Sequence, residues 1–249
     1  MADERLTIPA RFHELAEARH ELQNPTSADK IRLLGERLRL TGDSHVLDVG
    51  SGRGGPALLL AEEFGCRITG VELRAAFLAA AEERARRRGL ESRVRFVHAN
   101  ARELELAQRE YDAAICLGAS FVWGGFEATL AALAPTVRPG GHVAVGEPYW
   151  RAWPLPAGYP EPDAPWRPLD ETVGALERAG VRPTALIASS EDDWDRYESL
   201  HWQTLEEWLA ANRDEADADA VRAAHLAFRD RYLRWERAAL GWAIFVART

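Results

Sequence analysis

The stretch that decides the fold is V-L-D-V-G-S-G-R-G-G-P-A at residues 46–57. Its apolar start is typical of a buried strand, and Asp48 stands two positions ahead of a cluster of glycines: Gly50, Gly52, Gly54 and Gly55. A helical pattern over 56–64 follows at once. Glycine has no Cβ and tolerates positive φ, so this strand, turn and helix would let the backbone approach a bound small molecule.

Two glycine patterns overlap in this turn and imply different ligands. Residues 50–55 match G-x-G-x-x-G, the pattern of dinucleotide-binding turns. Residues 48–54 match D-x-G-x-G-x-G, which resembles motif I of class I S-adenosylmethionine (SAM) methyltransferases. A carboxylate at Asp48 suits the cationic aminoacyl end of SAM, whereas a pyrophosphate would be repelled. Glu72 lies about twenty residues after the turn, where an acid can accept both ribose hydroxyls of either ligand. A tight βα turn without a ligand is the third interpretation.

Length and composition favour one large α/β domain over 1–249. The formal net charge of −8 argues against a nucleic-acid partner. We expect no membrane segment and no signal peptide, because no apolar run is long enough and the first residues lack the pattern. Cys66 and Cys116 form no C-x-x-C pair, so we expect two buried thiols, no metal site and a cytoplasmic location.

Strand and helix patterns alternate between residues 45 and 146. The expected strands are 45–49, 67–72, 94–98, 111–117 and 142–146, and the expected helices are 56–64, 75–88 and 126–133. This order predicts a doubly wound parallel sheet with right-handed crossovers. Ligands of such sheets bind beyond the carboxyl ends of the strands. Four arginines near the end of the second helix (Arg84, Arg86, Arg87 and Arg88) are expected to be solvated and to complement the helix dipole.

The flanking segments predict further elements. The N-terminal cap segment, 1–28, has no strand pattern but could form a helix over 11–22; a second helix, capped by Ser27 or Asp29, is expected to reach residue 40. Residues 148–170 are rich in proline and tryptophan and predict an inserted lid or cover, because tryptophan favours burial. After them we expect a helix over 169–179, a strand over 184–188, helices over 192–211 and 221–240, and a last strand over 241–246.

Four further segments carry a resemblance over nearly the whole chain. They read H-E-L-Q-N-P at 20–25, G-A-S-F-V-W-G-G-F at 118–126, G-E-P-Y-W-R at 146–151, and D-W-D-R-Y-E at 193–198 with Trp202. With the glycine turn, they make the chain similar to class I SAM-dependent methyltransferases, and more narrowly to a bacterial family of poorly defined small-molecule substrate. The resemblance implies a seven-stranded, Rossmann-like sheet with an antiparallel seventh strand. It also implies SAM as the cofactor and S-adenosylhomocysteine (SAH) as the product.

The resemblance implies cofactor-binding residues at the strand ends: Asp48, Gly50, Gly52, Gly54, Glu72, Leu73, Asn100, Ala101 and Leu117. One position departs from the family pattern. Where the family has Asn-Asp-Ala after the third strand, this chain has Ala99-Asn100-Ala101. The Asn100 carbonyl can still accept a hydrogen bond from the adenine amine, but it brings no negative charge.

Methyl transfer from SAM is an in-line displacement in which the protein mainly supplies proximity, orientation and a water-poor pocket. An acid or base is needed only if the acceptor must lose a proton. The candidates for that role are His20, Glu147 and Tyr197. The candidates for contact with the acceptor are Asn24, Ser120, Trp123, Tyr149, Trp150, Arg151, His201 and Trp202. Each has a structural alternative: His20 could cap a turn, Arg151 could pair with Glu147, and the other aromatic rings could pack in the core.

The acceptor is expected to be a small molecule. Residues 116–120 read C-L-G-A-S and lack the N-P-P-Y pattern associated with methylation of adenine or glutamine nitrogen. The formal net charge of −8 also favours a small-molecule acceptor. Two other functions stay open, a SAM-binding module without transfer activity and an NAD-dependent oxidoreductase. The acceptor atom and the oligomeric state also stay open.

Overall fold

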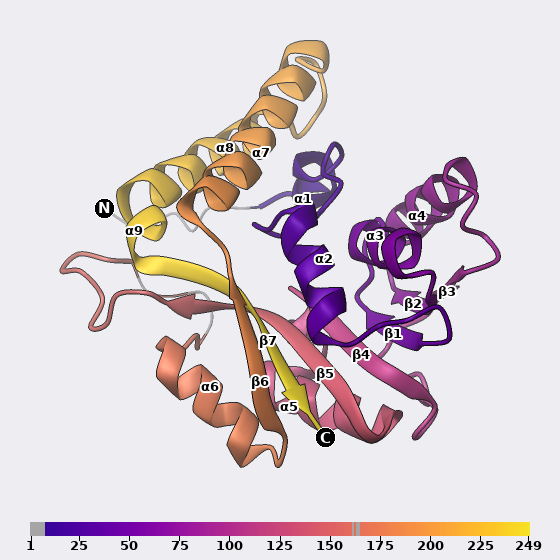
Figure 1. The fold of residues 1–249 in the computed structure, drawn as a ribbon. Coiled ribbons are helices and arrows are strands. Elements are labelled where there is room, and N and C mark those ends of the chain that lie inside the picture. The colour runs from indigo at the N-terminus through magenta and orange to yellow at the C-terminus, as the bar shows by residue number, and fades with distance from the viewer. Residues whose placement is uncertain (1–7, 161, 163–164) are drawn as a thin grey trace.

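The computed structural model describes residues 8–160, 162 and 165–249, and its centre is a mixed seven-stranded sheet (Figure 1). The strand order is β3-β2-β1-β4-β5-β7-β6. β1 to β5 are parallel, and β7 is antiparallel to both of its neighbours. The strands are β1 (His45–Val49), β2 (Arg67–Glu72), β3 (Val94–His98), β4 (Tyr111–Leu117), β5 (Val137–Trp150), β6 (Arg182–Ala188) and β7 (Leu240–Arg248). The doubly wound sheet and its antiparallel last strand confirm the predicted fold class.

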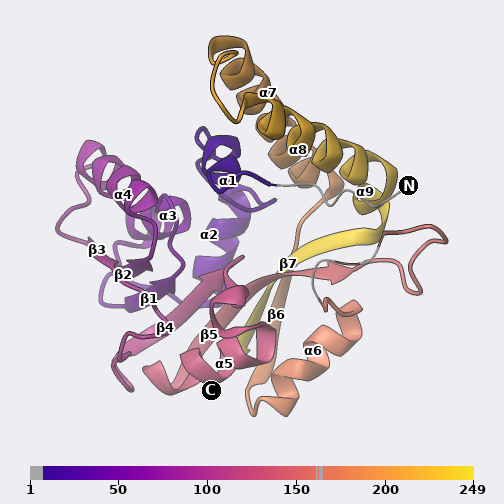
Figure 2. The ribbon, with the colours of Figure 1, turned by 180° about the vertical axis from the view of Figure 1, so that it is seen from behind.

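Helices cover both faces of the sheet (Figures 1 and 2). One face carries α2 (Ala28–Arg37), α3 (Gly55–Phe64) and α4 (Ala75–Arg87); the other carries α5 (Phe126–Leu133) and α6 (Leu169–Arg178). Each face has its own hydrophobic core: the first core lies under α2, α3 and α4, and the second core lies under α5 and α6. Successive side chains of a strand point to opposite faces, so Val46 belongs to the first core and Leu47 to the second. Ser27 caps α2 as predicted, because its hydroxyl accepts a hydrogen bond from the Lys30 amide at 3.3 Å.

A third, small core packs a helix near the start of the chain against two helices from its last quarter. It lies between α1 (Phe12–Ala16), α7 (Glu191–Ala211) and α8 (Ala218–Arg231). After α8 the chain continues through a π-helical turn, η3 (Tyr232–Glu236), and α9 (Arg237–Ala239) into β7. The helix predicted over 221–240 is therefore three consecutive pieces. Short 3₁₀ turns, η1 (Ser120–Trp123) and η2 (Ala134–Thr136), flank α5.

Two boundary predictions were wrong for tertiary reasons. The helix expected over 11–22 ends at Ala16; beyond it, the backbone carbonyls of His20 and Glu21 accept hydrogen bonds from the Arg84 side chain. The strand expected over 142–146 runs on to Trp150, because β7 pairs with it from His142 to Trp150.

Part of the predicted cover, 148–170, packs against the core of the sheet, whereas Trp153 within it is exposed. Its first three residues belong to β5. The Trp150 ring lies 5.4 Å from Tyr159 and 5.3 Å from Trp166, and all three pack in the first core. Residues 161, 163 and 164 of this segment, and 1–7 of the predicted cap segment, lie outside the described residues. None of the described helices combines the length and the apolar character needed to cross a bilayer.

Candidate active site

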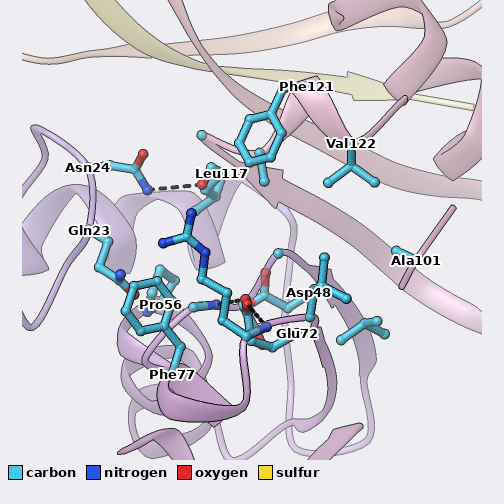
Figure 3. Close-up of a pocket in the computed structure, with 18 of the residues that line it drawn as sticks. Gln23, Asn24, Asp48, Pro56, Glu72, Phe77, Ala101, Leu117, Phe121 and Val122 are labelled. Atoms are coloured by element: carbon cyan, nitrogen blue, oxygen red, sulfur yellow. Dashed lines mark hydrogen bonds between the residues drawn. The ribbon is translucent and has the colours of Figure 1, made fainter. Parts of the chain in front are cut away.

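A cavity of about 490 Å³ lies at the carboxyl ends of β1, β2 and β4 (Figure 3). Eight of the nine predicted cofactor-binding residues line it: Asp48, Gly50, Gly52, Glu72, Leu73, Asn100, Ala101 and Leu117. Gly54 is not among the lining residues. It begins α3 with φ 77°, and a Cβ there would lie 2.8 Å from the Phe96 ring, so this glycine permits close packing of helix and strand.

Asp48 is a buried carboxylate that faces the cavity without a hydrogen-bond partner on one oxygen. The residue is only 2% exposed, and its Oδ2 atom has no partner within the described part of the chain. Burial, with a smaller contribution from the charge of Glu72, raises its pKa to about 7. A buried ionised group without a partner is costly. A cationic group of a ligand would relieve that cost.

Backbone amides hold the second carboxylate, Glu72, in place. Gly52 N–H donates to Oε2 at 2.8 Å, and Arg74 N–H donates to Oε1 at 2.7 Å. A carboxylate oxygen has more than one acceptor site, so both oxygens can still accept hydroxyl groups from a ligand. At the far end of the cavity, the side-chain oxygen Oδ1 of Asn100 accepts a hydrogen bond from the Arg102 amide at 3.1 Å and likewise keeps a second lone pair.

Residues 17–24, here called the cap loop, close the other side of the cavity. Asn24 Nδ2 donates to the Leu117 carbonyl at 3.0 Å (Figure 3), and the Arg53 amide donates to Gln23 Oε1 at 2.6 Å. A Cβ at Gly52 would collide with Gln23, and one at Gly118 would collide with Asn24. These glycines therefore make room for the cap loop as well as for a ligand.

Comparison with known proteins identifies the family. Residues 46–141 match the family model described as "Methyltransferase domain". The chain is 33% identical over 245 residues to Uncharacterized protein YjhP of Escherichia coli, an alignment that covers 96% of this chain and 98% of that one. A SAM-dependent methyltransferase from Geobacter sulfurreducens, solved in complex with SAH, superposes with a TM-score of 0.87 at 34% identity and covers 97% of this chain and 98% of that one.

The chain is a member of the SAM-dependent methyltransferase family. A second SAH complex, from Thiobacillus denitrificans, gives a TM-score of 0.89 at 32% identity, with 97% of this chain and 99% of that one covered. SAM is therefore the cofactor, and the NAD-dependent alternative is set aside. The buried carboxylate of Asp48, whose Oδ2 atom has no partner in the described part of the chain, and the glycine-lined turn beside it suit a cationic cofactor of this kind.

Two predicted catalytic residues of the methyltransferase do not line the cavity: His20, which lies within the cap loop, and Tyr197, which lies on α7. His20 Nε2 lies 3.0 Å from the Tyr197 carbonyl oxygen, and its ring centroid lies 4.4 Å from that of His201. Burial lowers the pKa of each histidine to about 4, so both imidazoles are neutral at physiological pH. Tyr197 contacts two residues that line the cavity, because its hydroxyl donates to Glu17 Oε1 at 3.3 Å and to the Gln23 backbone carbonyl at 3.4 Å.

The predicted residues on β5 lie apart from the cavity. Glu147 does not line the first cavity; burial raises its pKa to about 7, and the nearby Ser120 side chain acts in the opposite direction. Arg151 lies 3.7 Å from Glu191, so it does not pair with Glu147 as we considered. A second, more open cavity of about 740 Å³ is lined by Tyr149, Trp150 and Arg151. β5 carries these residues past the first cavity because its pairing with β7 continues to Trp150.

The remaining aromatic candidates pack in the protein interior, Trp123 against the second core and Trp202 against the first. None of the described residues of 148–170 lines the first cavity. The sequence analysis missed several residues that do: His13, Glu17, Gln23, Arg74, Phe77, Phe121 and Val122. Gln23 stands in the H-E-L-Q-N-P segment beside Asn24, so its place in that segment was a usable signal. Glu17 precedes the segment and carried none.

Proposed function

We propose that this SAM-dependent methyltransferase transfers its methyl group to a small-molecule acceptor, with SAM bound in the cavity at the ends of β1, β2 and β4. The observation that carries the proposal is the buried Asp48 carboxylate beside the glycine turn, whose Oδ2 atom has no hydrogen-bond partner among the described residues. A cavity of about 490 Å³ is in the size range of small-molecule sites. The net charge of −8 disfavours a nucleic-acid acceptor.

In this proposal three side chains orient the cofactor. Asp48 faces the cationic aminoacyl end, Glu72 accepts the ribose hydroxyls and Asn100 accepts the adenine amine. The two amides on Glu72 support the assignment, because they hold its carboxylate in one orientation. A relative 26% identical over 233 residues, covering 91% of this chain and 85% of its own, is named 27-O-demethylrifamycin SV methyltransferase, from Amycolatopsis mediterranei. That name supports a small-molecule acceptor here, on oxygen or another atom.

Isothermal titration calorimetry with SAM, SAH and NADH tests the cofactor site. We expect SAM and SAH to bind the wild-type protein, and Asp48→Ala and Glu72→Ala each to weaken SAH binding by about tenfold or more, as for loss of a hydrogen bond to a charged group. Asp43→Ala is the matched control, because Asp43 is an exposed acid outside the cavity. NADH binding without SAH binding would contradict the proposal.

Formation of SAH from SAM tests the acceptor class. The protein is incubated with SAM and with separate panels of small hydroxyl, amine and thiol compounds, bulk RNA, and unfolded protein. Turnover with a small molecule is the expected result, and turnover confined to RNA or protein would overturn it.

A cytoplasmic location belongs to the same proposal, supported by two buried free cysteines, and cell fractionation checks it.

A further inference from the structure

Glu17 is a carboxylate on the cap-loop side of the cavity. It follows α1 directly and lines the cavity. Gln23 Nε2 donates to its Oε2 at 2.7 Å, and the Tyr197 hydroxyl donates to its Oε1 at 3.3 Å. Both donors are neutral, and within the described ranges Glu17 has no Lys, Arg or His nitrogen at salt-bridge distance. The carboxylate is thus oriented but not neutralised.

The electrostatic surroundings leave this carboxylate available to a ligand. Burial raises the pKa of Glu17, while its two hydrogen bonds and the more distant charge of Arg74 act in the opposite direction. His201 is the nearby imidazole, but its own pKa of about 4 leaves it neutral near pH 7. A half-buried carboxylate with only neutral donors is suited to a positively charged or proton-donating group.

The cap loop fixes which end of the cofactor Glu17 would face. Gln23, its hydrogen-bond partner, contacts the glycine turn at Arg53, and Asn24 contacts the end of β4 at Leu117. In Figure 3, Gln23 and Asn24 lie on one side of the cavity and Ala101 on the opposite side. The proposed function assigns Asn100 and Ala101 to adenine and Asp48 to the methionine part. Glu17 therefore borders the methionine side, where the methyl group is transferred.

We infer that Glu17 is the acceptor-side carboxylate of the methyltransferase, which binds a hydroxyl or amine group and takes its proton during transfer; this inference rests on the proposed function. A lone pair of the acceptor oxygen or nitrogen forms a bond to the methyl carbon. The carbon–sulfur bond breaks, and its electron pair stays on sulfur to give neutral SAH. The acceptor proton passes to the Glu17 carboxylate. Tyr197 is a positioning residue, and Phe121 and Val122 give the acceptor an apolar wall.

Sinefungin tests this inference without a known acceptor. It is a SAM analogue with a primary amine, protonated at neutral pH, in the place of the transferred methyl group. Its ammonium would donate to Glu17, whereas SAH has no group there. We expect Glu17→Gln to lower the affinity for sinefungin about tenfold relative to SAH in calorimetry, as for loss of a charged hydrogen bond. Glu14→Gln, an exposed position on α1, should change neither affinity.

Each other outcome has a distinct meaning. An unchanged ratio of sinefungin to SAH affinity in Glu17→Gln would overturn the inference. An equal loss of both ligands would also overturn it, because Glu17 would then hold the aminoacyl group that the two share. Absence of SAH binding to the wild-type protein would instead contradict the proposed cofactor site, and the inference with it.

Two further variants separate the charge of Glu17 from its position. Tyr197→Phe keeps the Glu17 charge but removes one donor, so we expect a smaller fall in the same ratio. Should circular dichroism show that Glu17→Gln does not fold, Glu17→Asp gives the measurement instead. Its carboxylate is retained but set back by one methylene group, so the ratio should fall while SAH binding is kept. An unchanged ratio in Glu17→Asp would count against the inference in the same way.

Discussion

Two carboxylates, the buried Asp48 and the half-buried Glu147, have pKa values near 7 for the same main reason, which is loss of water around the charged form. Their surroundings differ. Asp48 lines the cavity, and its Oδ2 atom has no hydrogen-bond partner among the described residues, whereas Glu147 does not line the cavity. The ionisation of Asp48 should therefore be linked to cofactor binding, and that of Glu147 to folding.

SAH binding should strengthen as the pH rises from about 5 to 7 and then level off, because the cationic aminoacyl group favours ionised Asp48. Each pH unit below the Asp48 pKa of about 7 is expected to cost up to about tenfold in affinity. Calorimetry across this range measures the slope. Asp48→Asn should remove most of it, and an equal slope in that variant would assign the effect to another group.

Glu147→Gln should stabilise the fold at alkaline pH. The pKa of a glutamate carboxyl is ordinarily 4.5, and burial raises that of Glu147 to about 7 in the folded protein, so wild-type stability falls as the pH rises between these values. We expect the variant to gain on the order of 1–2 kcal/mol of unfolding free energy near pH 8 and almost nothing near pH 4.5. Urea unfolding at both pH values measures this, with the exposed Glu105→Gln as the control. A gain of equal size at both would refute the ionisation argument.

At the scale of elements, α4 does more than cover the sheet. We expected its arginines to be solvated, and this holds for Arg86 and Arg87, which are exposed and pair with Glu83. Arg84 is half-buried instead. It donates to the carbonyl oxygens of His20 at 2.9 Å, Arg53 at 3.2 Å and Glu21 at 3.4 Å. One side chain of α4 thus fastens the cap loop to the glycine turn.

Arg84→Ala should loosen the cap loop without unfolding the protein. Three backbone carbonyls lose their donor, so we expect faster amide hydrogen exchange over 18–24 and severalfold weaker SAH binding. Hydrogen-exchange mass spectrometry and calorimetry measure the two effects. Arg86→Ala, on the exposed side of the same helix, should change neither. Identical exchange in the two variants would show that the cap loop is held by its other contacts.

At the scale of the whole molecule, β7 joins the two sides of the sheet. It is paired along its length with β5 and β6, and its first eight residues are buried. Ile244 packs in the first core and the next residue, Phe245, in the second. The C-terminal strand therefore contributes to both cores of the sheet, while the residues that line the first cavity come from elsewhere.

Ile244→Ala should destabilise the protein without altering the cofactor-binding cavity. The side chain is fully buried, so its truncation is expected to lower the unfolding free energy by about 2–5 kcal/mol. SAH affinity of the folded variant should match the wild type. Leu226→Ala, at an exposed position on α8, is the control and should cost much less. A loss of unfolding free energy below about 1 kcal/mol in urea unfolding of Ile244→Ala would mean that the surrounding core repacks into the space left by the side chain.

The sequence by itself determined the strand–turn–helix at 46–57, the strands 45–49, 67–72, 94–98 and 111–117, and the positions of Asp48 and Glu72 toward the ends of the first two strands. These features depend on local apolar periodicity and on glycine conformation, which neighbouring residues encode. Only the tertiary structure decided which distant side chains share the cavity. Glu17 lines it with its carboxylate held by Gln23 and Tyr197, whereas Glu147, in the part of β5 that pairs with β7, does not line it. The Glu17–Tyr197 hydrogen bond and the β5–β7 pairing join residues far apart in the chain, and no local pattern records them.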